Sequence, residues 1–235
     1  MLLEVSNLTT AYNGLIAISD ISMNVAEGEI VVVAGANGAG KSTLLKSIAG
    51  MEKPQSGSVR FDGAPIDAMP AHQIPQRGLA YVPENRRLFP RLSVADNLRL
   101  GSYLYRKQAD REAPLEQVFT LFPRLKERLA QRAETLSGGE QQMLAIGRAL
   151  VTNPRLLILD EATEGLAPKI REEIWNCLAR LRQAGQTILV IDKYVERLLS
   201  LADQHVILER GKVVWTGDSR ALDADRGLWE RYLGV

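Results

Sequence analysis

The sequence predicts an α/β fold organised around a mainly parallel β-sheet. Short runs of β-branched and other apolar residues have the length of buried strands, and the longest stretches with helical spacing of apolar residues lie between them. Such alternation is typical of a parallel sheet with helices packed against it. The predicted core strands are residues 30–33, 79–82, 156–159, 187–191 and 205–208.

Two regions depart from this alternation. Near the N-terminus, residues 5–10, 18–25 and 58–61 indicate strands joined by tight turns such as Asp62-Gly63, which predicts antiparallel additions to the sheet. Between Pro83 and Pro154 the apolar spacing is mainly helical, at residues 94–104, 115–122 and 140–151. We therefore expect one domain over 1–235, with a core made of 1–83 and 155–235 and an inserted helical lobe at 84–154.

Composition narrows the class of partner. The chain has 235 residues, 46% of them hydrophobic, which is enough for a sizeable core, and its net charge of +1 argues against a nucleic-acid partner.

Its single cysteine, Cys177, excludes a disulfide within the chain and indicates a reducing compartment. The longest apolar run, at 29–35, is far shorter than the about 20 residues that cross a bilayer. His72 and His205 lack metal-ligand spacing.

A glycine-rich segment follows the first predicted core strand and leads into a helix. It reads Gly35-Ala36-Asn37-Gly38-Ala39-Gly40-Lys41-Ser42 and matches the pattern G-x-x-x-x-G-K-[ST] in the strand-to-helix context that this pattern requires. The glycines let backbone N–H groups turn toward phosphate oxygens at the positive end of the helix. Lys41 adds a point charge, and the Ser42 hydroxyl is placed to bind Mg²⁺. The segment predicts a nucleoside triphosphate site.

Two acidic residues follow the predicted strand at 156–159. Asp160 stands at its carboxyl end, where ligands of open α/β sheets bind, and we expect it to hold Mg²⁺ through water. Glu161 is then placed to act as general base for the attacking water, although as structure alone the pair could cap a helix. ATP is favoured over GTP because the chain has no Asn-Lys-x-Asp motif.

A third segment, Leu136-Ser137-Gly138-Gly139-Glu140, starts a predicted helix. Ser137 is suited to cap this helix, and the glycines expose backbone donors. Taken alone, the segment is equally an ordinary helix start. Within a nucleotide site formed by one chain it has no function, so together with the other two segments it predicts a chain that works in pairs.

In order and spacing, the three segments resemble those of nucleotide-binding subunits of ATP-binding-cassette (ABC) transporters, along the whole chain. The resemblance implies a P-loop NTPase cassette whose subunits pair around two ATP molecules, each held by one subunit and closed by the signature segment 137–140 of the other. It implies that Tyr12 stacks on adenine, although a lone tyrosine there would more often be a core aromatic. The implied nucleotide-binding residues are Tyr12, Gly35, Asn37, Gly38, Ala39, Gly40, Lys41, Ser42, Thr43, Ser137, Gly138, Gly139 and Glu140, with ATP and Mg²⁺ as ligands.

Longer phrases, at 82–91, 121–125, 141–150 and 164–168, are similar to the second ATPase of branched-chain amino-acid importers. This narrower resemblance implies an ATPase that energises import of branched-chain or other amino acids from the cytoplasmic face of the inner membrane. The implied partners are two membrane-spanning permease subunits, a second ATPase subunit that is identical or a sister chain, and indirectly a periplasmic solute-binding protein. The alternatives are an importer of amides or urea, and a soluble cassette ATPase that remodels a macromolecule.

Three positions depart from the general ABC pattern. Glu84 stands where most cassettes have glutamine, and it is either a further Mg²⁺ ligand or a solvated loop acid. Ala167 replaces an aspartate, which weakens the case for polar communication between the two sites.

Lys193 occupies the switch position, which is usually histidine. A lysine about 4 Å from a phosphate charge attracts it by about 4 kcal/mol at an effective dielectric near 20, so Lys193 either senses the γ-phosphate or points to solvent. We expect catalytic roles for Glu161, Lys193 and Glu84, and metal ligation by Ser42, Asp160 and Glu84.

The basic segment at 86–91 allows two interpretations. It is either a solvated loop or, by the resemblance, the surface that meets a cytoplasmic coupling helix of a membrane subunit. In the second case Leu88 and Phe89 would be its apolar anchors.

Overall fold

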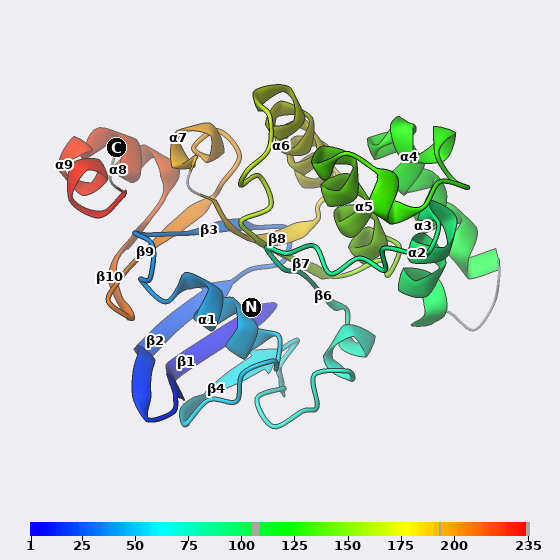
Figure 1. Ribbon diagram of the computed structural model, residues 1–235. Coiled ribbons are helices and arrows are strands. Elements are labelled where there is room, and N and C mark those ends of the chain that lie inside the picture. The colour runs from blue at the N-terminus through cyan, green and yellow to red at the C-terminus, as the bar shows by residue number, and fades with distance from the viewer. Residues whose placement is uncertain (105–108, 193, 234–235) are drawn as a thin grey trace.

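The strands form two sheets in separate layers (Figure 1). The computed structural model describes residues 1–104, 109–192 and 194–233. The larger sheet has the order β10-β9-β3-β8-β7-β6, and the smaller has the order β2-β1-β4-β5. The strands are β1 (Leu3–Tyr12), β2 (Leu15–Val25), β3 (Ile30–Ala34), β4 (Ser56–Phe61), β5 (Ala64–Pro65), β6 (Leu79–Val82), β7 (Leu156–Asp160), β8 (Thr187–Ile191), β9 (Gln204–Glu209) and β10 (Lys212–Gly217).

The larger sheet confirms the predicted parallel core. Neighbouring strands from β9 through β3, β8 and β7 to β6 pair in parallel, and β10 adds an antiparallel edge to β9. Strands β6 and β8 have the predicted bounds, while β3, β7 and β9 extend the predicted strands by one residue at one or both ends. The central strands are buried on both faces, which is why they appear in the sequence as continuous apolar runs.

The smaller sheet confirms the predicted antiparallel additions. Strand β1 pairs antiparallel with both β2 and β4. The turn Asp62-Gly63 that joins β4 to β5 has two successive left-handed residues, with φ of 51° and 72°. A two-residue hairpin turn with this twist needs positive φ at both residues. Asp-Gly adopts that conformation readily, which is why this dipeptide predicted a hairpin.

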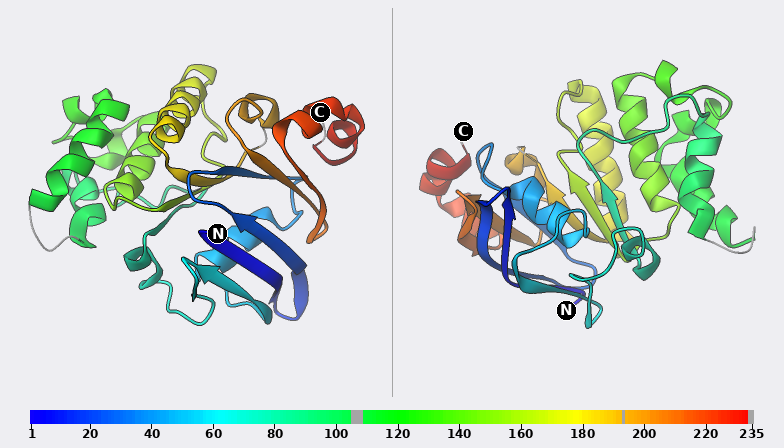
Figure 2. Two further views of the ribbon diagram at one scale, coloured as in Figure 1. Left: turned by 180° about the vertical axis from the view of Figure 1, so that it is seen from behind. Right: turned by 60° about the horizontal axis from the view of Figure 1, so that its bottom comes forward.

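Two hydrophobic cores lie on opposite faces of the larger sheet. In β3, Ile30 and Val32 pack into the core shared with α5 (Gly138–Leu150) and α6 (Pro168–Gln183). Val31 and Val33 pack into the core shared with α1 (Lys41–Ile48) and the smaller sheet. Strand residues alternate between faces, so one strand serves both cores. Figures 1 and 2 show the consequence, which is that α1 and α5 are carried on opposite sides of the sheet.

Of the helices between β6 and β7, α5 packs on one face of the larger sheet, and α2, α3 and α4 lie beside α5 on the side away from α6 (Figures 1 and 2). The division into a core and a lobe at residues 84 and 154 stays a prediction. The helices are α1 (Lys41–Ile48), α2 (Val94–Gly101), α3 (Ala109–Leu121), α4 (Pro123–Glu127), α5 (Gly138–Leu150), α6 (Pro168–Gln183), α7 (Val195–Leu198), α8 (Ser219–Ala224) and α9 (Arg226–Leu228). Short 3₁₀ turns cover Ile74–Arg77, Ser102–Leu104 and Ala133–Thr135, and a π-helical turn covers Trp229–Leu233.

One predicted helix ends earlier than expected. The helix expected at 94–104 is α-helical only to Gly101 and continues as a 3₁₀ turn. At Gly101 a β-carbon would lie 2.3 Å from the carbonyl oxygen of Arg148 in α5. Close approach of the two helices therefore requires glycine at this point, and glycine favours the end of a helix.

The helices bear on two expectations from the sequence, the environment of Cys177 and membrane spans. Cys177 is buried in α6 with a free thiol, as a small packed side chain. Within the described residues, no helix combines the length and apolar character needed to cross a bilayer.

Candidate functional site

The phosphate loop between β3 and α1 is held in place by close backbone packing. Gly35 has φ of 140°, and a β-carbon there would lie 2.2 Å from the carbonyl oxygen of Leu208 in β9. Gly40 has φ of 100°, and its β-carbon would lie 2.6 Å from Ile18 in β2. Other residues would be strained or would clash at both positions, so these glycines fix the loop between the two sheets.

The loop brings Lys41 and Ser42 to the start of α1. The Lys41 ammonium group donates to the carbonyl oxygens of Gly35 at 2.8 Å and Ala36 at 3.0 Å, so the cation lies across the loop. Lys41 is 8% exposed, which places this charge in a largely desolvated position. Anions bind well at such a place because the helix N-terminus and the lysine act together.

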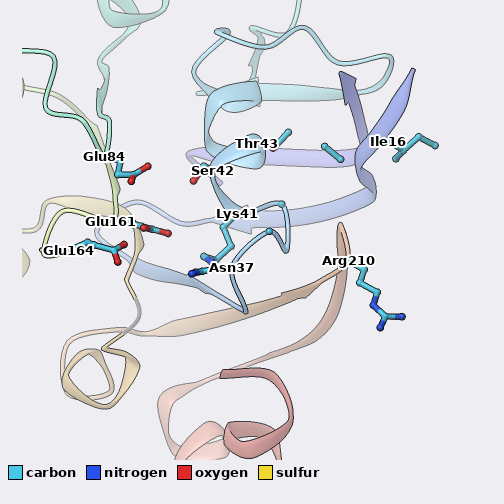
Figure 3. A pocket seen from close by; sticks show the side chains of 12 residues that line it. Ile16, Asn37, Lys41, Ser42, Thr43, Glu84, Glu161, Glu164 and Arg210 are labelled. Carbon is cyan, nitrogen blue, oxygen red and sulfur yellow. The ribbon is translucent and has the colours of Figure 1, made fainter. Parts of the chain in front are cut away.

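A cavity of about 710 Å³ opens beside this loop. Figure 3 shows the carboxylates of Glu84, Glu161 and Glu164 on one side of the loop, with Ile16 and Arg210 on the other. The cavity therefore has an acidic end and a less acidic end, with the lysine between them. Its lining residues are Ile16, Ala17, Asn37, Gly38, Gly40, Lys41, Ser42, Thr43, Glu84, Glu161, Glu164 and Arg210.

Asp160 ends β7 and is only 2% exposed. Its Oδ1 accepts a hydrogen bond from the Ser42 hydroxyl at 2.9 Å, and its Oδ2 accepts one from the Tyr81 hydroxyl at 2.8 Å. The structure thus joins Ser42 and Asp160, which are 118 positions apart in the sequence. A hydroxyl and a carboxylate are oxygen ligands of the kind Mg²⁺ takes when phosphates supply further ligands.

The described residues offer no self-sufficient metal cage. Among them, no group of three or more His, Cys, Asp and Glu side chains is arranged to hold a metal ion. This fits Mg²⁺ held by one or two protein oxygens and a nucleotide, since this ion keeps several waters and seldom uses an all-protein site.

Glu161 follows Asp160 in a left-handed backbone conformation, with φ of 52°. Its N–H donates to the Ile191 carbonyl oxygen at the end of β8, at 3.0 Å, which fixes the turn. A hydrogen bond with Glu164, together with burial and the charge of Glu164, raises the pKa of Glu161 to about 7, against the opposing charge of Lys41. A carboxyl group with this pKa is suited to accept a proton near neutral pH.

The signature segment starts α5 with a complete capping box. The Ser137 hydroxyl accepts a hydrogen bond from the Glu140 N–H at 3.3 Å, and the Glu140 carboxylate accepts one from the Ser137 N–H at 2.9 Å. Burial tends to raise the pKa of Glu140, but the bonds from Ser137 and the charge of Arg128 outweigh it and lower that pKa. Glu140 is therefore an anionic support for the segment.

The exposed part of the signature segment is not part of the cavity beside its own phosphate loop. Ser137 and Gly138 are exposed, and the segment contributes none of the described residues that line the cavity. Gly139 is buried, and a β-carbon there would lie 2.6 Å from Ile170 in α6. The segment thus has free surface but no phosphate-binding partner within this chain's own cavity.

The remaining predicted residues differ in how the structure places them. Glu84 lines the cavity and is exposed, and Ala167 precedes α6 without a side-chain cap. Tyr12 ends β1, is 37% exposed and is not among the described residues that line the cavity. Lys193 lies outside the described residues, so its predicted role stays a prediction.

The basic segment at 86–91 is hydrogen-bonded to α5 at its first two residues. Arg86 donates to the side-chain oxygens of Gln141 and Gln142, both at 3.1 Å, and Arg148 donates to the carbonyl oxygens of Arg86 and Arg87. Phe89 remains 50% exposed. The loop after Glu84 is thus fastened to the helix that carries the signature segment.

Some residues of the site were not predicted from the sequence. Ile16, Ala17, Glu164 and Arg210 line the cavity, and Tyr81 contacts Asp160. Glu164 is three positions after Glu161, a spacing that could have suggested a pair. Arg210 and Tyr81 gave no such signal, because one lies in a distant hairpin turn and the other in an ordinary strand pattern.

Comparisons with known proteins show the family of the chain. Residues 18–164 match the family model described as ABC transporter. The chain is 43% identical over 233 residues to the high-affinity branched-chain amino acid transport ATP-binding protein BraG of Pseudomonas aeruginosa, covering 99% of this chain and 100% of that protein.

Solved structures show the same likeness. One described as the ATP binding subunit of an ABC transporter superposes with a TM-score of 0.85 at 30% identity, covering 100% of this chain and 97% of that one. A dimeric bacterial ABC transporter cassette superposes with a TM-score of 0.83 at 26% identity, covering 93% and 99%.

The fold and the site together define a P-loop ATPase. A phosphate loop lies between two sheets, and the buried strand β7 leads to Glu161, which lines the cavity beside that loop, and ends in Asp160, which is hydrogen-bonded to Ser42 of the cavity wall. The chain belongs to the ABC transporter family.

Proposed function

We propose that this chain is the ATP-hydrolysing subunit of an importer for branched-chain amino acids, held by two permease subunits at the cytoplasmic face of the inner membrane. The observation that carries the proposal is the cavity lined by the phosphate loop, Ser42 and Glu161, with the buried Asp160 hydrogen-bonded to Ser42 at its wall. The amino-acid specificity is supported by the full-length likeness to BraG, a branched-chain amino acid transport protein.

The two ends of the cavity suggest how ATP lies in it. The triphosphate would follow the phosphate loop past Lys41 toward the acidic end, with Mg²⁺ offsetting repulsion from the carboxylates. The nucleoside would lie toward Ile16 and Ala17 of β2. Tyr12 lies on the same β1–β2 hairpin, where it pairs with Leu15, and could reach adenine by a side-chain rotation.

Ser42 and Asp160 would hold Mg²⁺, with Glu84 as a further ligand. When bound, the ion would neutralise charge on the β- and γ-phosphate oxygens. Glu161 would accept the proton of the attacking water, because it lies next to the metal carboxylate and has a pKa of about 7. Lys193, which directly follows Asp192 at the end of β8, would contact the γ-phosphate by its charge.

The signature segment would complete the site of a second ATPase subunit. Its exposed Ser137 and Gly138, its capping box and its absence from the chain's own cavity support this arrangement. The second subunit would be a copy of this chain or a sister chain, as in the dimeric cassette structure that the fold resembles.

The loop after Glu84 would transmit the closure of the two subunits to the permeases. A groove of about 180 Å³ lies between this loop and the start of α5, lined in part by Asn85, Leu88 and Pro90. Phe89 is exposed beside it, and Arg148 lies 5.6 Å from its ring centre. A short helix of a permease could bind there through apolar contacts, while the periplasmic binding protein would act only through the permeases.

Uptake by cells tests the transported solute. Cells whose chromosomal copy carries Glu161→Gln are compared with parent cells for uptake of labelled leucine, isoleucine and valine, and of urea and acetamide. Loss of the three branched-chain amino acids alone is expected. Loss of only urea or acetamide would contradict the proposed solute, and unchanged uptake of all five would contradict an importer of these compounds.

Mixing of variants tests the shared site for the case of two identical subunits. In a Glu161→Gln background, which slows turnover, Lys41→Ala impairs the phosphate loop and Ser137→Arg blocks the signature segment. Neither variant alone should dimerise with ATP in size-exclusion chromatography, but their mixture should, since one composite site is then intact. A mixture that stays monomeric, while the Glu161→Gln parent dimerises, would contradict a site shared between copies.

A further inference from the structure

The Tyr81 hydroxyl contacts the same carboxylate that the proposed metal site uses. It donates to Asp160 Oδ2 at 2.8 Å, while Ser42 donates to Oδ1 at 2.9 Å. Each oxygen of the carboxylate therefore has its own hydroxyl donor, and the two donors come from separate elements, α1 and β6.

The fold fixes Tyr81 in this position. In the parallel pair β6–β7, Tyr81 lies beside Ile158. Ile158 precedes Asp160 by two residues, so the side chains of all three residues are on the same face of the sheet. The Tyr81 ring packs against the core that contains Leu44, Leu45 and Ile48 of α1. Because the ring is held by both the sheet and the helix, its hydroxyl can restrain the rotation of the Asp160 carboxylate.

The chemistry of the pair favours a lasting hydrogen bond. A phenol keeps its proton at neutral pH, and the carboxylate has only acceptor atoms, so the Tyr81 hydroxyl is the donor of this hydrogen bond. A hydrogen bond to a charged acceptor is stronger than one between neutral groups. Ser42 could release Oδ1 when Mg²⁺ binds, whereas Tyr81 would keep Oδ2.

We propose that Tyr81 is a positioning residue of the metal site, which holds the Asp160 carboxylate with Oδ1 toward Ser42, the other proposed ligand, and Oδ2 on the Tyr81 hydroxyl. This inference rests on the proposed role of Asp160 in binding Mg²⁺. It adds a residue that touches neither nucleotide nor metal and acts only through the carboxylate.

The position of Tyr81 also joins two parts of the site. Tyr81 precedes Glu84 by three residues, and β6 is the strand from which the loop carrying Glu84 departs. The hydrogen bond from Tyr81 to Asp160 therefore joins β6 to the end of β7 close to the two residues, Glu84 and Glu161, that follow these strands and line the cavity. Loss of the hydroxyl should affect metal binding without removing the packing of the ring.

The test measures how nucleotide binding depends on Mg²⁺ in the full-length protein. Binding of the fluorescent, slowly hydrolysed analogue mant-AMPPNP is titrated with Mg²⁺ and, separately, measured in EDTA. For Tyr81→Phe we expect the half-saturating Mg²⁺ concentration to rise about tenfold, as for other groups that orient metal ligands, with binding in EDTA unchanged. Tyr103→Phe, at a side chain that is 81% exposed, is the matched control and should behave as the parent.

Two reference variants separate the possible outcomes. Asp160→Asn tests the metal site itself, and Tyr81→Leu removes the hydroxyl by a second route in case the phenylalanine variant is poorly folded. If Asp160→Asn shifts the Mg²⁺ dependence and neither Tyr81 variant does, the positioning role is wrong and the proposed metal site stands. If Asp160→Asn causes no shift, the metal site and the inference both fail. Equal weakening with Mg²⁺ and in EDTA would show that Tyr81 has only a structural role.

Discussion

Stability of this protein should fall in mild acid because of one buried histidine. His205 in β9 is 0% exposed, and its Nε2 lies 2.8 Å from the Ser219 hydroxyl oxygen in α8. Ser219 uses its own proton to donate to the Ala202 carbonyl oxygen at 2.8 Å, so His205 Nε2 must donate to Ser219. Nδ1 is then the unprotonated nitrogen, and it has no hydrogen-bond partner within the described part of the chain.

The pKa of His205 gives the size of the effect. Burial lowers it to about 4 from its ordinary value of 6.5, although the charge of Asp218 opposes the shift. Above pH 6.5 the imidazole is neutral in both the folded and the unfolded chain, so its titration does not change the stability there. Between 6.5 and 4 only the unfolded chain takes up the proton, and the folded state loses about 2 kcal/mol by pH 5 and about 3 kcal/mol by pH 4.

The assay is urea unfolding at pH 8, 7, 6 and 5 at constant ionic strength. The chain contains only two histidines, which allows a matched pair of variants. His205→Gln keeps a side-chain donor for Ser219 but does not titrate, and His72→Gln removes the exposed histidine. The quantity compared is the change in unfolding free energy between pH 8 and pH 5, so a constant cost of substituting a buried residue cancels.

We expect this change to be smaller by about 2 kcal/mol in His205→Gln than in the parent, and unchanged in His72→Gln. Other groups, such as Glu161, titrate in all three proteins and cancel in the comparison. An identical loss of stability on acidification in His205→Gln and the parent would refute the reasoning, because it would mean that His205 is protonated as readily in the folded chain as in the unfolded one.

Two further predictions concern turnover. In Glu164→Gln, loss of the carboxylate that raises the pKa of Glu161 should move the acid limb of the ATPase pH profile down by about one pH unit, and an unmoved limb would contradict the pairing. In the assembled transporter, Lys193→Ala should lower ATP turnover about tenfold or more because a cation at the γ-phosphate is lost, with Lys169→Ala as a control at another lysine. Equal turnover in Lys193→Ala and the parent would remove the proposed role.

Much of the fold was predictable because its signals are local. The central strands are buried on both faces, so each appears as an apolar run, and strands β6 and β8 were located with their observed bounds. The end of α2 was not predictable in this way. It depends on the approach of Gly101 to Arg148, which are 47 positions apart (148 − 101).

In the candidate site, too, some residues could be predicted from the sequence and others could not. The phosphate loop and the acidic pair were predicted because each is a contiguous motif with a defined chemistry. Tyr81 and Arg210 were missed because an ordinary strand residue and a hairpin residue acquire their roles only from neighbours distant in the chain. Glu164 was close enough to Glu161 to be suspected, but only the folded turn shows that the two carboxyl groups interact.

By itself, the sequence determined the class of fold, the nucleotide-binding motifs and the family, since these depend on residue types at fixed local spacing. The tertiary structure alone decided that Tyr81 and Ser42 divide the two oxygens of Asp160 and that His205 is buried with a bare Nδ1. The reason is physical: hydrogen-bond partners, desolvation and pKa values depend on atoms brought together by packing, and their separation along the chain carries no information about that contact.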